Sequence, residues 1–182
     1  LFPSMALSLQ VFEERYRTLV AECLETGEPF GVALIKQGAE VGGNAVPYSI
    51  GTTARIRRLS PTRDGRLALE AVGERRFRVR SAFEDRPYLS AEVEFPVDEV
   101  AEISDELLSQ ARSRFEQLQR LRHTIANEYY REIAIPETPG ALADAIGALG
   151  RGLTTERMLQ RLLATLNVRR RLEDASEIAA AV

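Results

Sequence analysis

The sequence contains a single cysteine, a single histidine, a single lysine and no tryptophan among its 182 residues. One cysteine excludes a disulfide within the chain, and Cys23 and His123 together cannot supply the four ligands of a structural zinc site. The apolar runs fall far short of the roughly 18 residues that suggest a membrane span, and no cationic stretch followed by an apolar one looks like a signal peptide. We therefore expect no metal, no membrane partner and a reducing, cytoplasmic location.

Catalytic motifs are equally scarce. The only lysine, Lys36, lies in a strand-like pattern rather than in a glycine-rich phosphate loop, and no serine stands in a Gly-x-Ser-x-Gly context. With one histidine, acid-base chemistry would depend on carboxylates alone. The sequence therefore predicts a protein that is not an enzyme and that carries no cofactor.

What is present is typical of a globular protein: 45% hydrophobic residues, 28% charged residues and a formal net charge of −3. The periodicity of the apolar residues changes near residue 98, from short period-two runs to long period-3.6 runs. We expect an α+β protein with two subdomains, a β-barrel with one helix over residues 1–98 and a helical bundle over residues 99–182.

The first subdomain begins with a strand pattern at 5–11, followed by a helix from Glu13 that Gly27 ends. The predicted inward stripe of that helix is Phe12, Tyr16, Leu19, Val20, Cys23 and Leu24. Further strands are expected at 30–35, 49–59, 66–72, 75–82 and 88–95, with a hairpin turn at Asp64–Gly65 and a loop over 38–47. Five or six short strands around one helix indicate a closed or nearly closed barrel.

The second subdomain contains four helical patterns. Ser104 can cap a long helix with the apolar face Leu107, Leu108, Ala111, Phe115, Leu118, Leu121 and Ile125. A short helix is expected over 141–149, and a third follows Thr154 or Thr155 with Met158, Leu159, Leu162, Leu163 and Leu166 facing inward. The last helix is marked by Val168, Leu172, Ala175 and Ile178.

The arginines of residues 75–82 are the first candidate site. Arg76, Arg78 and Arg80 alternate with apolar residues, so a strand would place their guanidinium groups on one face as a contact for an anion or a nucleic acid. The favoured interpretation is a solvated face, paired across the sheet with Glu92, Glu94 or Glu70. The acidic total also disfavours nucleic acid as a partner.

Three other features invite a functional interpretation. Tyr129 and Tyr130, near the end of the long helix, are candidate peptide-binding residues, although packing of both rings is the favoured role. The run of arginines at 169–171 lies on a helix that also carries acidic residues, so we expect it to pair within the helix rather than bind an anion. Cys23 falls on an apolar stripe and is expected to be a buried, inert thiol.

Six segments of the first subdomain, taken in order, resemble the N-terminal substrate-binding domain of Lon proteases. They are LFP at 1–3, LQVFEERYR at 9–17, FGV at 30–32, PYSIGT at 47–52, GERRFRV at 73–79 and PYLSAEVE at 87–94. The helical half is similar to the continuation of that domain through PGALAD at 139–144 and LATLNVRRRL at 163–172. The resemblance covers nearly the whole chain.

The resemblance implies a PUA-like pseudo-barrel followed by a small helical bundle, as in stand-alone Lon-domain proteins that lack the ATPase and peptidase domains. It also implies recognition of unfolded or partly folded polypeptide, without catalysis, and association with an AAA+ protease as an adaptor. The alternative is a PUA-like RNA-binding protein that uses the arginine face. The substrate, the binding surface and the oligomeric state stay open.

Overall fold

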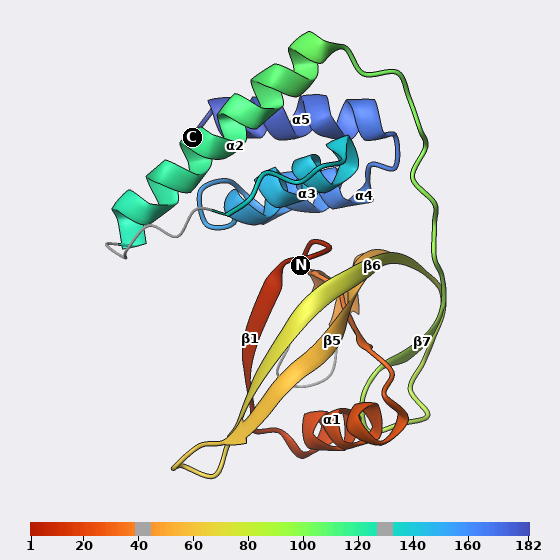
Figure 1. Ribbon diagram of the computed structural model, residues 1–182. Helices are drawn as coiled ribbons and strands as arrows, with labels where there is room; N and C mark the ends of the chain where they lie inside the picture. Colours follow the sequence, from red (N-terminus) through yellow and green to blue (C-terminus); the bar gives the residue numbers. More distant parts are fainter. Residues whose placement is uncertain (39–44, 127–132) are drawn as a thin grey trace. The chain divides into compact units, whose positions relative to one another are not determined.

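The computed structural model describes residues 1–38, 45–126 and 133–182. These residues divide into two units, the first with Leu1 and Pro3–Pro96, the second with Phe2 and Val97–Val182. Strands dominate the first unit and helices the second, which confirms the predicted α+β class (Figure 1). Within the described part of the chain, no helix has the length and apolar character needed to cross a membrane.

The first unit is built on an antiparallel sheet. Its strands are β1 (Ala6–Val11), β2 (Phe30–Val32), β5 (Ile50–Pro61), β6 (Leu67–Phe83) and β7 (Ser90–Glu94). Their order is β1-β6-β5-β2, and β7 pairs with the far part of β6. A separate ribbon joins β3 (Ile35–Gln37) to β4 (Val46–Pro47), so residues 46–47 are a strand rather than the end of the predicted loop. Residues 39–44 of that loop lie outside the described residues.

The hairpin of β5 and β6 forms the centre of this sheet (Figure 1). Its turn is the predicted Asp64–Gly65 pair, where Gly65 has φ +79°, a conformation that favours glycine. The two strands predicted at 66–72 and 75–82 are one strand of 17 residues, because the pairing with β5 shifts register between Thr52 and Ala54 instead of breaking. Gly73 lies opposite this shift and also donates its N–H to the Met5 carbonyl.

Helix α1 (Glu14–Thr26) supplies one side of the core of the first unit, and Gly27 ends it with φ +69°, as predicted. The fully buried core joins residues of this helix to residues of the sheet: Val11, Val20, Cys23, Phe30, Ala54, Leu69 and Ala71. The prediction of an inward-facing stripe is wrong for two residues, since Phe12 is 57% exposed and Leu24 is 53% exposed. Phe12 precedes the helix, and its ring lies beneath the Arg66 guanidinium at 5.5 Å. Leu24 is turned about 100° from buried Cys23.

The second unit consists of α2 (Asp105–Ala126), α3 (Pro139–Leu149), α4 (Glu156–Ala164) and α5 (Val168–Ala180). Side-chain oxygens cap the starts of these helices, because the first N–H groups of a helix have no partner within it. Ser104 Oγ accepts from the Leu107 N–H at 3.3 Å, and Thr155 Oγ1 accepts from the Met158 N–H at 3.3 Å. Both caps were predicted, and Thr138 and Asn167 cap α3 and α5 in the same way.

The core of the second unit is apolar and close to fully buried. Its largest members are Phe115, Leu118, Leu142, Ile146, Leu162, Leu172 and Ile178. The residues predicted to face inward are buried or half-buried except at the ends of two helices, where Ile125 is 59% exposed and Met158 is 37% exposed. Ile125 lies in the last turn of α2.

Candidate functional site

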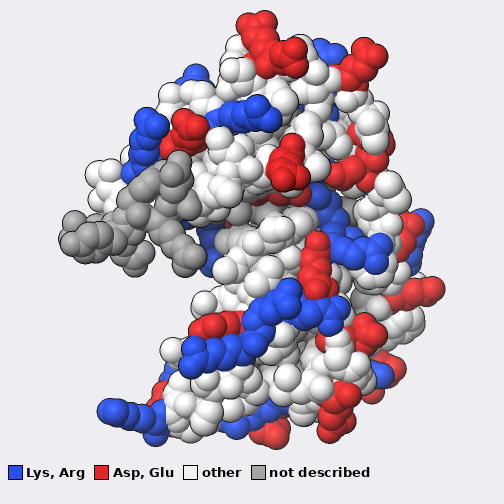
Figure 2. Space-filling view, in the orientation of Figure 1, with Lys and Arg blue, Asp and Glu red and all other residues white. Residues whose placement is uncertain are grey.

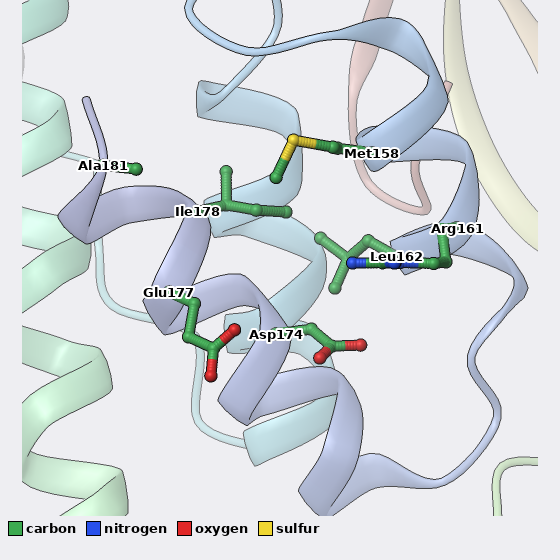
Figure 3. A pocket seen from close by; sticks show the side chains of 7 residues that line it. All are labelled: Met158, Arg161, Leu162, Asp174, Glu177, Ile178 and Ala181. Carbon is green, nitrogen blue, oxygen red and sulfur yellow. The ribbon is translucent and has the colours of Figure 1, made fainter.

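The helical unit contains a pocket of about 240 Å³ between α4 and α5 (Figure 3). Its lining residues are Met158, Arg161 and Leu162 from α4 and Asp174, Glu177, Ile178 and Ala181 from α5 and its C-cap. Their spacings of three and four place them on one face of each helix. The pocket is thus formed where the facing stripes of two amphipathic helices meet.

The pocket joins apolar and charged surfaces. Leu162 and Ile178 are buried, with 1% and 5% of their surface exposed, whereas Met158 stays accessible and accepts the Thr154 hydroxyl at 3.4 Å on its sulfur. Arg161, Asp174 and Glu177 bring one positive and two negative charges to the lining, and in the described part of the chain none of the three has an ion-pair partner within 4.0 Å.

The chemistry of this lining is that of binding. It includes no histidine, cysteine, serine or lysine that would act as a nucleophile or transfer a proton near neutral pH. Apolar atoms beside unpaired charges can accept an aliphatic side chain that ends in a polar group, because the stem is buried while the polar end stays hydrated.

The arginine face of β6 differs from an open basic patch. Arg78 Nη1 donates to Glu94 Oε1 at 3.0 Å, and Arg80 pairs with the other oxygen of Glu94. This pairing is the predicted one, because the register of β6 and β7 places Arg78 opposite Glu94. Arg76 is only 8% exposed, so the three arginines do not form one accessible row. On the face drawn in Figure 2, basic and acidic side chains are interspersed.

The other candidate contacts have different outcomes. Tyr129 and Tyr130 lie outside the described residues, so their role as peptide-binding residues stays a prediction. Arg169 pairs with Glu173 at 3.0 Å within α5, as expected. Cys23 is buried, and burial raises the pKa of its thiol, with a further increase from the charges of Glu22 and Glu28.

Arg171 is where the sequence interpretation is wrong. Its side chain is fully buried, and its guanidinium reaches outside its own helix to Asp98, with 2.8 Å between Nη1 and Oδ1. Nη1 also donates to the Thr165 carbonyl at 2.9 Å, and Nε lies 3.5 Å from Asp144 Oδ1. Burial opposes the charged form, but the hydrogen bonds with Asp98 and the charge of Asp144 outweigh it, so the pKa of Arg171 is raised.

A signal for this buried cluster was present in the sequence. Asp144 is the only charged residue of the apolar helix Pro139–Leu149, and a carboxylate in the middle of such a stripe needs a cation. The ion pair of Arg171 with Asp98 joins residues 73 positions apart, so no local pattern reveals it. Among the described residues, no group of three histidine, cysteine or acidic side chains is arranged to hold a metal ion.

These observations define an α+β protein of two units, with a pocket between α4 and α5 that is lined by apolar and charged side chains. The sequence matches the family model of the ATP-dependent protease La (LON) substrate-binding domain over residues 1–181. The chain belongs to this family, which confirms the resemblance found in the sequence.

Curated relatives agree with this assignment. The Lon protease of Desulfosudis oleivorans is 28% identical over 179 residues, which are 95% of this chain and 21% of that protein. The Lon protease of Syntrophus aciditrophicus is 24% identical over 185 residues, 97% of this chain and 23% of that protein. The chain therefore spans about a fifth of the length of the curated relatives it matches.

Solved structures share the fold. The crystal structure of a Lon N-terminal domain protein from Xanthomonas campestris has a TM-score of 0.69 and 29% sequence identity, and the match covers 95% of this chain and 89% of that one. The N-terminal domain of the Lon protease of the Mycobacterium avium complex has a TM-score of 0.67 at 21% identity, covering 99% of this chain and 92% of that one.

Proposed function

We propose that this chain recognises unfolded or exposed apolar segments of polypeptides for proteolysis and carries out no chemistry itself. The observation that carries this proposal is the family match, in which the model of a substrate-binding domain covers residues 1–181 of this chain. The matched region leaves no part of these 182 residues for an ATPase or peptidase domain. The active machinery is then an AAA+ protease in the cytoplasm, which this chain serves as an adaptor or as its recognition part.

The pocket between α4 and α5 supports this function as one contact for such a segment. Met158 is 37% exposed at a pocket in which Leu162 and Ile178 are buried. An apolar side chain of an unfolded segment gains free energy by leaving water there, and a folded protein does not offer that side chain. Recognition by burial of apolar surface is insensitive to salt, because screening acts on charges.

The direct test is a titration with a permanently unfolded protein, reduced and carboxymethylated α-lactalbumin, followed by fluorescence polarisation at low and moderate salt. We expect saturable binding that varies little with salt. The variant Met158→Glu should bind about tenfold more weakly, because it places a charge at the apolar contact. Val100→Glu is the matched control, since Val100 is 95% exposed in the same unit and lies outside the pocket. A complete lack of association by the wild-type chain would overturn the proposal.

Binding of RNA through Arg76, Arg78 and Arg80 is the alternative function. The ion pairs of Glu94 with Arg78 and Arg80 weigh against it, because each phosphate contact would first have to break an existing pair. Burial of Arg76 removes a third cation from the accessible face. We therefore place polypeptide ahead of nucleic acid as the partner.

A further inference from the structure

Strand β1 forms one end of the main sheet, and it lacks the features that usually protect such an edge. Its sequence, ALSLQV, contains no charged residue and no proline, in a chain where 28% of residues are charged. It pairs with β6 over six consecutive residues without a register shift, and in the described part of the chain β6 is its only partner. Exposed edges of this kind are templates for pairing with another strand.

The other ends of the sheet are different. Strand β2 has only three residues, which offers little length for pairing. Strand β7 carries Glu92 and Glu94, and its pairing with β6 shifts register between Val79 and Ser81. Short length, charge and register shifts are devices that discourage edge pairing. Strand β1 is therefore the edge best suited to accept a further strand.

The hydrogen-bond phase of β1 shows which of its backbone groups face outward. The Met5 carbonyl accepts from the Gly73 N–H at 2.9 Å, so the backbone carbonyl of Met5 points toward β6. In an antiparallel pair every second residue directs its N–H and C=O to the same side. Ala6, Ser8 and Gln10 therefore direct their backbone groups away from β6, and all three residues are exposed.

A row of leucines ends at the same edge. Leu59, Leu69 and Leu9 lie directly opposite one another across β5, β6 and β1. Leu69 is 1% exposed, whereas Leu9 at the end of the row is 39% exposed. A strand added beside β1 would place a side chain next to Leu9 and continue the buried row, because side chains on paired strands align across a sheet.

We propose that β1 binds an extended, uncharged polypeptide segment by β-strand addition, with apolar side chains at every second position of the segment. This inference rests on the proposed function and specifies how that function recognises its substrate. The outward backbone groups of Ala6, Ser8 and Gln10 pair with the main chain of the segment. The row that ends at Leu9 selects apolar residues on one face of the segment. Main-chain pairing tolerates many sequences, which suits a domain that meets many unfolded proteins.

The charge of the edge selects the same occupant. A charged residue of the segment would leave water beside six uncharged side chains of β1, and the charges nearest to it belong to the neighbouring strand and turn, where Glu70 lies opposite Ser8 and Arg66 donates to Gln10 Oε1 at 3.2 Å. An uncharged segment avoids that penalty. A second copy of β1 is also uncharged, so pairing between two chains is an outcome that the experiment has to separate.

The test compares Ser8→Pro with Ser8→Ala. Proline at position 8 removes one outward N–H and leaves the bonds between β1 and β6 in place, whereas alanine keeps the N–H. The probe is a capped ten-residue peptide that alternates valine and threonine, together with the same peptide N-methylated at alternate amides. We expect Ser8→Pro to bind the peptide at least about tenfold more weakly, Ser8→Ala to bind within about twofold of wild type, and the N-methylated peptide not to bind.

The outcomes separate this inference from the proposed function. Circular dichroism and thermal unfolding first establish that both variants are folded. If Ser8→Pro binds the peptide and unfolded α-lactalbumin as wild type does, the β1 inference is overturned and the proposed function stands. If wild type binds neither probe, both are overturned. If Ser8→Pro abolishes a dimer seen by sedimentation and leaves peptide affinity unchanged, β1 pairs with its own copy and the inference is likewise overturned.

Discussion

Arg171 and Asp98 form a two-pronged ion pair, in which both terminal nitrogens of the buried guanidinium donate to the two oxygens of one carboxylate. Asp144 lies on the remaining side of the guanidinium, 3.5 Å from Nε, and is itself only 5% exposed. This cluster ties the start of the second unit, at Asp98, to α3 and α5. A charge buried in this way requires its partners, because water cannot replace them.

Replacing Arg171 with methionine should therefore lower the free energy of unfolding by about 3–5 kcal/mol, because the buried Asp144 carboxylate loses its cation. Arg169→Met is the matched control on the same helix. It removes only the exposed pair with Glu173 and should change stability by less than about 0.5 kcal/mol. Urea unfolding followed by circular dichroism measures both, and equal losses for the two variants would refute the structural role of the cluster.

Gly140→Ala tests how tightly the same cluster is packed. A Cβ atom at position 140 would lie 2.8 Å from Arg171 Nη2 and 3.2 Å from Asp98 Oδ2, so the buried ion pair would have to move. We expect a loss of about 1–3 kcal/mol. At Gly150 the nearest atoms would be 3.4 Å away, and its φ of −70° suits alanine. Gly150→Ala should accordingly be neutral or stabilise by up to about 1 kcal/mol in the same unfolding experiment; a similar loss at both positions would contradict this account.

The thiol of Cys23 gives a pH-dependent prediction. Burial, with the charges of Glu22 and Glu28, raises the pKa of this group in the folded chain above its ordinary value of 9.0. The folded state then keeps the proton over an interval in which the unfolded state releases it. The contribution of Cys23 to stability is complete below the unfolded pKa and declines as the pH rises above about 9.0.

Alkylation by iodoacetamide measures this protection, because only the thiolate reacts. At pH 9 the folded chain should react at least about tenfold more slowly than the chain in concentrated guanidinium. Cys23 is the only cysteine, so Cys23→Ser provides the background. Equal rates in the folded and unfolded chains would show that the thiol is accessible.

The arginine face of β6 is expected to bind nucleic acid weakly. Arg78 and Arg80 are already paired with Glu94, so fluorescence polarisation with a labelled RNA hairpin should not detect the binding that is typical of phosphate contacts, in which affinity falls steeply between about 50 and 200 mM salt. Glu94→Gln removes that carboxylate and should increase RNA binding at low salt. Arg78→Gln should leave the affinity for unfolded α-lactalbumin unchanged within about twofold. Steep salt-dependent binding by wild type would favour the RNA alternative.

The sequence by itself determined the α+β class and the position and caps of most elements, because these depend on local periodicity and on residues within one turn of each other. Ser104, Gly27 and the Asp64–Gly65 turn act at short range, so their roles could be read from the chain. The family resemblance and the placement of the β6 arginines on a strand with acidic partners were also accessible, whereas the choice of Glu94 among Glu70, Glu92 and Glu94 required the register of β6 and β7.

Tertiary structure decided what depends on distant parts of the chain. The merging of two predicted strands into β6 depends on a register shift opposite Gly73. The burial of Arg171 depends on Asp98, which is 73 residues away. The open edge of β1 also appears only once strand order is known, because a sequence pattern predicts that a strand exists and says nothing about which neighbour it has.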